Sequence, residues 1–123
     1  IGRVQLKKLD EFNTRRREIA MTYNAHLSEY VKVPKNRRGH VFHQYTILCE
    51  KRDSLRSHLN SKDVGSGIYY PSLLYEYAPM SDFIADCPNA KRLTETALSL
   101  PVHPALSDSD VSKVIDSVIS FFD

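Results

Sequence analysis

Apolar residues recur at three- and four-residue steps along the first thirty positions of the chain, with charged side chains between them. The apolar set comprises Leu6, Leu9, Phe12, Ile19, Tyr23, Leu27 and Tyr30. This spacing puts one apolar stripe on a helix and predicts a single long amphipathic helix over residues 4–30. At about 1.5 Å per residue it would be roughly 40 Å long, more than a domain of this size needs to cover its own core. The pattern therefore indicates a neighbour outside this chain.

Two later stretches have the composition of β-strands. Residues 34–40 are polar and basic and contain proline and glycine, which predicts a connecting loop. Residues 41–49 are rich in β-branched and aromatic side chains, and neither alternating face is wholly polar. We expect a strand there with partial cover on both sides, and a second strand over residues 65–70.

The remaining pattern predicts three shorter helices and one short strand. Asp53 is placed to cap the first of these helices. The second begins at Asn89, after an irregular stretch over 72–88, and is followed by a strand over 100–103. The apolar residues of these two helices are Leu55, Leu59, Leu93, Ala97 and Leu98.

The last helix has the clearest pattern in the chain. Its apolar positions form one stripe and are Val111, Val114, Ile115, Val118, Ile119 and Phe122. Ser107, with the acidic Asp110 three positions later, resembles a capping box, and Asp108 and Asp110 suit the positive end of a helix.

These elements place the chain in the α+β class, with a small antiparallel or mixed sheet packed against helices and led by a long N-terminal helix. The 123 residues are 41% hydrophobic and 26% charged, which is enough for one core. We expect a single domain over 1–123, made of a linking helix at 1–32 and an α+β body at 40–123. Ile1 and Gly2 precede the helical pattern without a methionine or a capping residue, which predicts that the chain is part of a longer one.

The charge and the cysteines exclude several classes of protein. Seventeen basic and fifteen acidic residues give a net charge of +2, and the basic residues are scattered apart from 15–17 and 37–38, so no nucleic-acid partner is expected. The arginine triplet at 15–17 is expected to be a solvated helix face. Because no apolar run approaches the ~18 residues of a membrane span and no leader is recognisable, we expect a soluble, cytoplasmic protein without a membrane partner. Cys49 and Cys87 are expected to be buried, reduced thiols.

The segment 65–75 crowds two glycines and three tyrosines, Tyr69, Tyr70 and Tyr75, into eleven residues. Glycine allows close approach of another group, and tyrosine offers a flat apolar face with one hydroxyl. The composition is compatible with a ligand-binding lip, although aromatic residues near proline and glycine usually belong to core packing beside a turn. His43, in the first predicted strand, is either a pocket residue or a half-buried structural histidine.

Known catalytic and metal-binding patterns are missing from the sequence. None of the five histidines stands in a metal-ligand or hydrolase motif, and we predict no metal site. His103 is expected only to hydrogen-bond a turn. The Gly65-Ser66-Gly67 run lacks the lysine and the following helix of a phosphate loop. Paired carboxylates for acid–base chemistry are also absent, so the residues alone do not argue for catalysis.

Three groups of motifs resemble the C-terminal small domain of the DegT-type (DegT/DnrJ/StrS) sugar aminotransferases, which are fold-type I enzymes that use pyridoxal phosphate. The first group is GRVQLKKLD at 2–10 with RRR at 15–17 and YN at 23–24; the second is HVFHQY at 40–45, RDSL at 52–55 and GSGIYYP at 65–71; the third is PNA at 88–90, LSLPVHP at 98–104 and DV at 110–111. The resemblance covers nearly the whole chain.

The resemblance implies transfer of an amino group, commonly from glutamate, to a keto sugar linked to a nucleotide, in polysaccharide or amino-sugar biosynthesis. It implies that the Schiff-base lysine and the other pyridoxal phosphate partners belong to a large domain outside this chain. No catalytic or cofactor-binding residue and no bound cofactor are therefore expected here, and the chain alone should be inactive. The full-length enzyme is expected to be a homodimer.

The resemblance also implies that Tyr69, Tyr70 and Tyr75 lie on the sugar side of the site, and we add His43. The family pattern is His-Tyr-Pro with a second histidine four residues after the proline, so tyrosine replaces histidine at 69 and 75. A phenol is neutral near pH 7, and an acidic sugar would lose a charge-assisted contact worth ~1.5–3 kcal/mol.

Two alternatives to the enzyme remain open. One is a non-catalytic binding or regulatory protein on the same scaffold, suggested by the two replaced histidines. The other is a free-standing interaction module that dimerises through Leu6, Leu9, Phe12 and Ile19 of the long helix.

Overall fold

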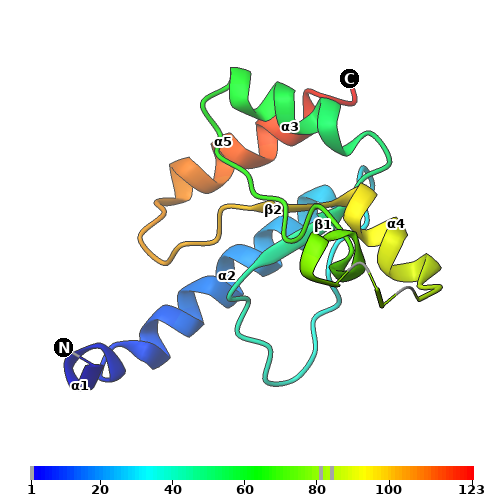
Figure 1. Ribbon diagram of the computed structural model, residues 1–123. Helices are drawn as coiled ribbons and strands as arrows, with labels where there is room; N and C mark the ends of the chain where they lie inside the picture. The colour runs from blue at the N-terminus through cyan, green and yellow to red at the C-terminus, as the bar shows by residue number, and fades with distance from the viewer. Residues whose placement is uncertain (1, 81, 84) are drawn as a thin grey trace.

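The chain folds into an α+β domain with helices around a small sheet, which confirms the predicted class (Figure 1). The computed structural model describes residues 2–80, 82–83 and 85–123; the prediction about the start of the chain involves Ile1, which lies outside them. The elements are α1 (Gly2–Leu6), α2 (Leu9–Leu27), β1 (Tyr45–Leu48), α3 (Arg52–Ser61), the 3-10 turns η1 (Leu74–Glu76) and η2 (Ala78–Met80), α4 (Pro88–Thr96), β2 (Ala97–Leu100) and α5 (Asp108–Ile119).

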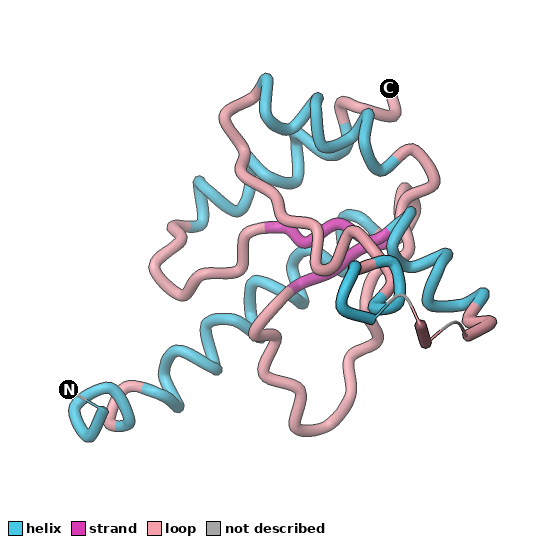
Figure 2. The backbone as a smooth tube through the Cα atoms, viewed as in Figure 1, coloured by secondary structure: helices cyan, strands magenta, loops and turns pink. Residues whose placement is uncertain are grey.

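The sheet joins segments that are fifty residues apart in the sequence. β1 and β2 are antiparallel, with Tyr45 opposite Leu100 and Leu48 opposite Ala97. An isolated bridge extends the sheet on each side, Lys32 with Leu48 and Gly67 with Ser99. The loop that precedes β1 extends well away from the sheet (Figure 2).

The core lies between the sheet and three helices. α5 packs against both α2 and α3, and α3 contacts β2. The largest fully buried side chains are Tyr23, Tyr45, Phe42, Ile19, Leu27, Ile47, Leu55, Leu59, Leu98 and Val118. The apolar stripes predicted for α3 and α5 therefore supply the core, except that Phe122 is exposed.

The prediction of one helix over 4–30 is wrong at both ends. The helix breaks at Lys7 and Lys8, where Lys8 donates its N–H to the Gln5 carbonyl, and α2 ends at Leu27. A helix is stabilised mainly by packing, and no residue of α1 is buried. The first turns extend away from the body, as Figure 1 shows.

The predicted dimer stripe is not continuous either. Ile19 is 1% exposed within the chain's own core, whereas Leu6 lies before the break and Leu9 begins α2, and both are exposed. The four residues therefore do not form one free surface, and the alternative of dimerisation through them loses its basis.

The predicted strands were wrong in extent. Residues 41–44 are not a strand, because Phe42 adopts a positive φ of 47° and turns its ring into the core while Val41 and His43 stay exposed. The strand expected over 65–70 is reduced to the Gly67–Ser99 bridge. The third strand is 97–100 instead of 100–103: Ala97 is already extended (φ −76°, ψ 131°) and Pro101, which lacks an N–H, follows its end.

The two predicted caps had opposite outcomes. Asp53 is not the cap of α3: the N-cap position is Lys51, without a side-chain hydrogen bond, and the Asp53 carboxylate lies 2.6 Å from Arg52 Nε. The capping box of α5 is confirmed. Asp110 donates its N–H to Ser107 Oγ at 3.1 Å, and Asp110 Oδ2 accepts the Ser107 N–H at 2.9 Å. The Ser107 hydroxyl also donates to Asp110 Oδ2, at 2.6 Å, and this bond together with that from the Ser107 N–H lowers the pKa of Asp110.

Two surface predictions need correction. Both cysteines are free, but only Cys49 is buried and Cys87 is exposed, since it precedes α4 at the surface. The solvated face expected at 15–17 is confirmed only for Arg17, which is exposed and donates to the His40 carbonyl. Arg15 and Arg16 are partly buried, and Arg15 binds Asp108 at 2.7 Å and the Leu106 carbonyl at 2.9 Å. Among the described residues, no helix is long and apolar enough to cross a membrane.

Candidate functional site

Two cavities meet at Tyr69. The first, here called the apolar hollow, measures about 620 Å³ and is lined by Thr46, Leu48, Tyr69, Tyr70, Ser72, Leu73, Leu74, Tyr77, Ala90, Leu93, Thr94 and Ala97. The second, here called the polar hollow, measures about 550 Å³ and is lined by Arg16, His43, Gln44, Gly65, Ser66, Gly67, Tyr69, Ser99, Leu100, Pro101, Val102 and His103. Among the described residues, only Tyr69 lines both hollows, so its ring separates an apolar surface from one that contains the cationic Arg16.

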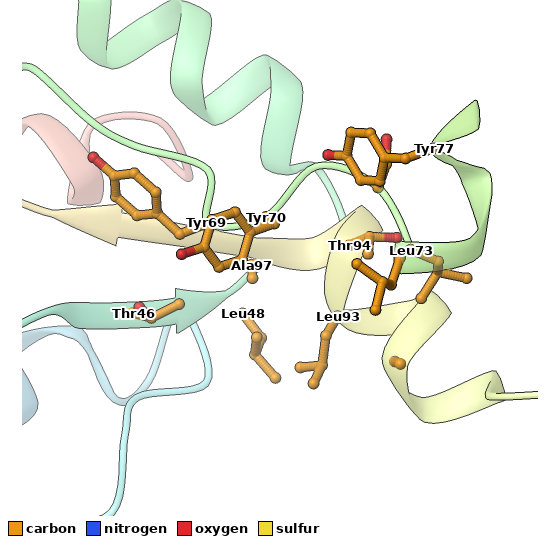
Figure 3. A pocket seen from close by; sticks show the side chains of 12 residues that line it. Thr46, Leu48, Tyr69, Tyr70, Leu73, Tyr77, Leu93, Thr94 and Ala97 are labelled. Carbon is orange, nitrogen blue, oxygen red and sulfur yellow. The ribbon is translucent and has the colours of Figure 1, made fainter. Parts of the chain in front are cut away.

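The apolar hollow is built from the sheet, α4 and the segment after Gly67. Figure 3 shows Tyr69 and Tyr70 on one side of it, Tyr77 and Leu73 on the other, and Leu48 beside Leu93 between them. Unlike ordinary core residues, Tyr70 is 75% exposed and Leu93 is 49% exposed. An open surface of aromatic and aliphatic side chains suits a flat or partly apolar group.

The position of Tyr69 depends on Gly67. A Cβ atom at Gly67 would lie 2.5 Å from Tyr69 Cε2, so the ring can occupy its place only because residue 67 has no side chain. The rings of Tyr69 and Tyr70 meet edge to face, with centroids 6.3 Å apart, and a cis peptide bond joins the two residues.

The polar hollow brings together side chains from four segments of the chain. Arg16 comes from α2, His43 from the loop before β1, Ser66 from the segment that pairs with β2, and His103 from the loop after β2. His103 Nδ1 accepts the Ala105 N–H at 3.1 Å, which confirms the turn contact expected for it. Since Nδ1 is an acceptor, the proton of the neutral ring is on Nε2.

Two part-buried tyrosine hydrogen bonds hold α2 against the sheet and against Pro101, which lines the polar hollow. Tyr23 donates its hydroxyl to the Pro101 carbonyl at 2.8 Å, and Tyr45 donates to Asn24 Oδ1 at 2.6 Å. Burial raises the pKa of both tyrosines, so both remain neutral donors. The two hydrogen bonds therefore tie α2 to β1 and to the residue that follows β2.

The predicted site residues are only partly brought together. Tyr69 and Tyr70 line the apolar hollow, and Tyr69 and His43 line the polar hollow. Tyr75 lines neither of them and lies in η1, where burial and the nearby Cys87, Glu76 and Asp86 raise its pKa.

Sequence reasoning missed Arg16, Tyr77 and Leu93 as cavity residues. The helical period carried a usable signal for Arg16, because three consecutive arginines point in three directions and Ile19, three positions after Arg16, is buried. For Tyr77 and Leu93 no local signal exists, because only the tertiary packing of η1, η2 and α4 places them together.

No lysine lines either hollow. All eight are exposed. A Schiff base with pyridoxal phosphate requires a lysine amine at the site. The described residues therefore do not fit that cofactor on their own. They also contain no cluster of three or more histidine, cysteine or acidic side chains able to hold a metal.

Comparison with known proteins places this fold among sugar aminotransferases. The chain is 36% identical to dTDP-4-dehydro-2,3,6-trideoxy-D-glucose 4-aminotransferase of Saccharopolyspora spinosa, over 94% of this chain and 31% of that protein. It is 34% identical to a pleiotropic regulatory protein of Geobacillus stearothermophilus, over 97% of this chain and 34% of that one. The chain thus spans about a third of the length of these relatives.

Solved structures agree. A DegT DnrJ EryC1 StrS aminotransferase from Brucella abortus superimposes with a TM-score of 0.88 at 33% identity, over 94% of this chain and 32% of its own. The aminotransferase TlmJ from Streptoalloteichus hindustanus gives 0.90 at 34% identity, over 98% and 34%. The sequence model of the whole family matches residues 1–119. The chain belongs to the DegT/DnrJ/EryC1/StrS aminotransferase family.

Proposed function

We propose that this chain is the C-terminal, substrate-side domain of a pyridoxal phosphate-dependent aminotransferase that transfers an amino group to a keto sugar on a nucleotide. Tyr69, Tyr70, Tyr75 and His43 are the proposed substrate-binding residues; Tyr69, Tyr70 and His43 line the hollows, and Tyr75 is proposed from the family resemblance alone. The observation that carries this proposal is the pair of hollows meeting at Tyr69, in a chain of this family. Relatives named as aminotransferases of dTDP- and UDP-linked sugars support the substrate class.

The cofactor is proposed to be held by residues outside this chain. Pyridoxal phosphate supplies an aldehyde that carries the amino group and a ring that acts as an electron sink. Because all eight lysines here are exposed and none lines either hollow, the Schiff-base lysine is proposed to come from the remaining two thirds of a longer protein. In that protein we propose glutamate as the amino donor, a homodimer and a cytoplasmic location.

The role of this chain's residues is to bind and orient the sugar. The exposed faces of Tyr69 and Tyr70 offer apolar contact to a sugar ring, and their hydroxyls can donate and accept hydrogen bonds. Since a phenol is neutral near pH 7, position 69 favours a neutral sugar over an acidic one.

The test is transamination by the longer protein that contains this chain, with a keto-sugar nucleotide as the acceptor. Tyr69→Ala and Tyr70→Ala should each raise KM for the sugar nucleotide at least tenfold. Tyr30→Ala is the matched control, because Tyr30 is partly exposed and lines neither hollow. If the Tyr69 and Tyr70 variants bind and turn over substrate like the parent, the site assignment is wrong.

One observation favours a second function, a non-catalytic regulatory protein on the same scaffold. It is the 34% identity to a relative named as a pleiotropic regulatory protein, together with tyrosine at positions 69 and 75. The two functions differ in one feature of the longer protein. A lysine in the Schiff-base position supports the enzyme, and absorbance of a lysine-bound pyridoxal phosphate in the purified protein would detect it.

A further inference from the structure

We propose that the polar hollow binds a phosphoryl group, the diphosphate of a nucleotide-linked substrate whose sugar lies across Tyr69 in the apolar hollow. This inference rests on the proposed function and adds a second binding region to it. It concerns Arg16 and His103, which that proposal does not use.

The charge of the lining is the first argument. Arg16, His43 and His103 converge on this hollow from three segments, and no carboxylate is among the residues that line it. A guanidinium is charged at any physiological pH, and its planar fork matches phosphoryl oxygens. The apolar hollow has no charged lining residue, so an anion should bind in the polar hollow.

Unused hydrogen-bond donors are the second argument. The Arg16 guanidinium makes a single hydrogen bond among the described residues, a long one of 3.4 Å to Asn13 Oδ1. His103 accepts at Nδ1, which leaves Nε2–H as a donor. Ser66 Oγ is buried and has no partner in the described part of the chain. Buried polar atoms normally have a hydrogen-bond partner. The unpaired Ser66 hydroxyl lines the hollow, where a bound ligand could supply that partner.

The rigidity of the hollow is the third argument. The Gly67 N–H binds the Ser99 carbonyl at 3.0 Å, and the Ser99 N–H binds the Gly67 carbonyl at 2.7 Å, so the wall that carries Ser66 is fixed to β2. Tyr23 donates its hydroxyl to the carbonyl of Pro101, which also lines the hollow. Because these groups are already ordered, binding an anion there costs little conformational entropy.

The size and position of the hollow favour a diphosphate. Its volume of about 550 Å³ exceeds what one phosphoryl group needs, and it adjoins the apolar hollow at Tyr69. A nucleotide sugar has a matching arrangement, because its anionic diphosphate is bonded directly to a neutral sugar ring. The carboxylates of the amino donor share part of this chemistry, so the test includes both ligands.

The test is a titration of the 123-residue chain with inorganic pyrophosphate, followed by two-dimensional NMR of the backbone amides. We expect saturable shifts at Gly65, Ser66 and Gly67. Arg16→Gln and His103→Gln should each weaken pyrophosphate binding at least fivefold. The matched controls Arg56→Gln and His26→Gln, both exposed and outside the hollow, should bind like the parent. Circular dichroism and thermal unfolding of each variant show that it is folded.

Three outcomes would overturn the inference. The first is that the Gly65–Gly67 amides do not shift, and the second is that the control variants lose as much affinity as Arg16→Gln, which indicates non-specific attraction. The third is that glutamate displaces pyrophosphate and binds more tightly, which assigns the hollow to the amino donor.

The two proposals fail separately. If Tyr69→Ala raises KM in the longer protein while Arg16→Gln leaves it unchanged, the phosphoryl site is wrong and the aminotransferase proposal stands. If pyrophosphate binds as expected and the longer protein has no aminotransferase activity, the site stands and the proposed function is wrong.

Discussion

At the scale of single residues, Tyr69 and Gly67 form a unit that determines where the two hollows meet. A methyl group at residue 67 would overlap the Tyr69 ring, whereas one at Gly65 would have nothing within 4 Å. The contact involves the far end of a side chain that is 53% exposed, so the ring can move without disturbing the backbone.

Gly67→Ala is therefore expected to displace the Tyr69 ring while changing the free energy of unfolding by less than about 1 kcal/mol. The measurement is the pattern of ring–ring nuclear Overhauser contacts between Tyr69 and Tyr70, together with urea unfolding. Gly65→Ala is the control and should leave the ring contacts unchanged. Intact Tyr69–Tyr70 contacts in Gly67→Ala would refute this role of the glycine.

The buried tyrosines give the protein a predictable response to alkali. Burial raises the pKa of Tyr23 and Tyr45 in the folded chain above the value of about 10 in the unfolded chain. As the pH rises, the unfolded state loses these protons first. The contribution of the two tyrosines to the free energy of unfolding is therefore fully present below about pH 10 and is lost as the pH rises further.

Tyr23→Phe should reduce the alkaline slope of the free energy of unfolding by up to about 1.4 kcal/mol per pH unit. It should also lower the free energy of unfolding by about 1 kcal/mol near pH 7, because the hydrogen bond to the Pro101 carbonyl is lost. Urea unfolding between pH 8 and pH 11 measures both effects. Tyr30→Phe, at an exposed position outside the core, should follow the parent. An unchanged alkaline slope in Tyr23→Phe would contradict the assignment.

At the scale of elements, α5 shows how a local signal specifies a helix start. Ser107 and Asp110 satisfy each other's N–H groups at the point where the helix lacks internal partners. The same residues are followed by the apolar stripe that packs against α2 and α3.

Ser107→Ala should destabilise the chain by about 1 kcal/mol, because it removes the N-cap hydroxyl. Ser109→Ala changes an exposed serine in the first turn of the helix and should have little effect. Thermal unfolding of the two variants is the comparison, and equal melting temperatures would show that the cap contributes nothing.

The cap also depends on an ionised Asp110 carboxylate, whose pKa is lowered in the folded chain. Its contribution to stability is therefore present above the unfolded pKa of about 4 and is lost as the pH falls through the folded value.

At the scale of the whole molecule, the core and the apolar hollow are separate apolar surfaces, and each contains a leucine from the same part of the chain. Leu98 is fully buried between the sheet and the helices, whereas Leu93, five residues earlier, is half exposed and lines the apolar hollow. The core determines stability, and the hollow is an open surface that the fold does not need to close.

Leu98→Ala should therefore lower the free energy of unfolding by about 2–5 kcal/mol, since it leaves a cavity in the core. Leu93→Ala should lower it by less than about 1 kcal/mol and instead weaken ligand contact at the hollow. Urea unfolding of both variants is the measurement. Equal losses would mean that the hollow is part of the core.

The sequence by itself determined the class of the fold, the apolar faces of α3 and α5 and the capping box. Each of these depends on residues within a few positions of one another, where helical period and capping chemistry act locally. The resemblance of its motifs to those of the family was confirmed over residues 1–119. The Gly65–Tyr75 segment also contained Tyr69 and Tyr70, which line the hollows.

Only the tertiary structure decided the length of the strands, the break at Lys7 and the convergence of Arg16, His43 and His103. The physical reason is the same in each case. A strand needs a partner fifty residues away, the first helical turns have no core to pack on, and a cavity is formed by side chains from segments whose separation in sequence carries no information about their distance in space.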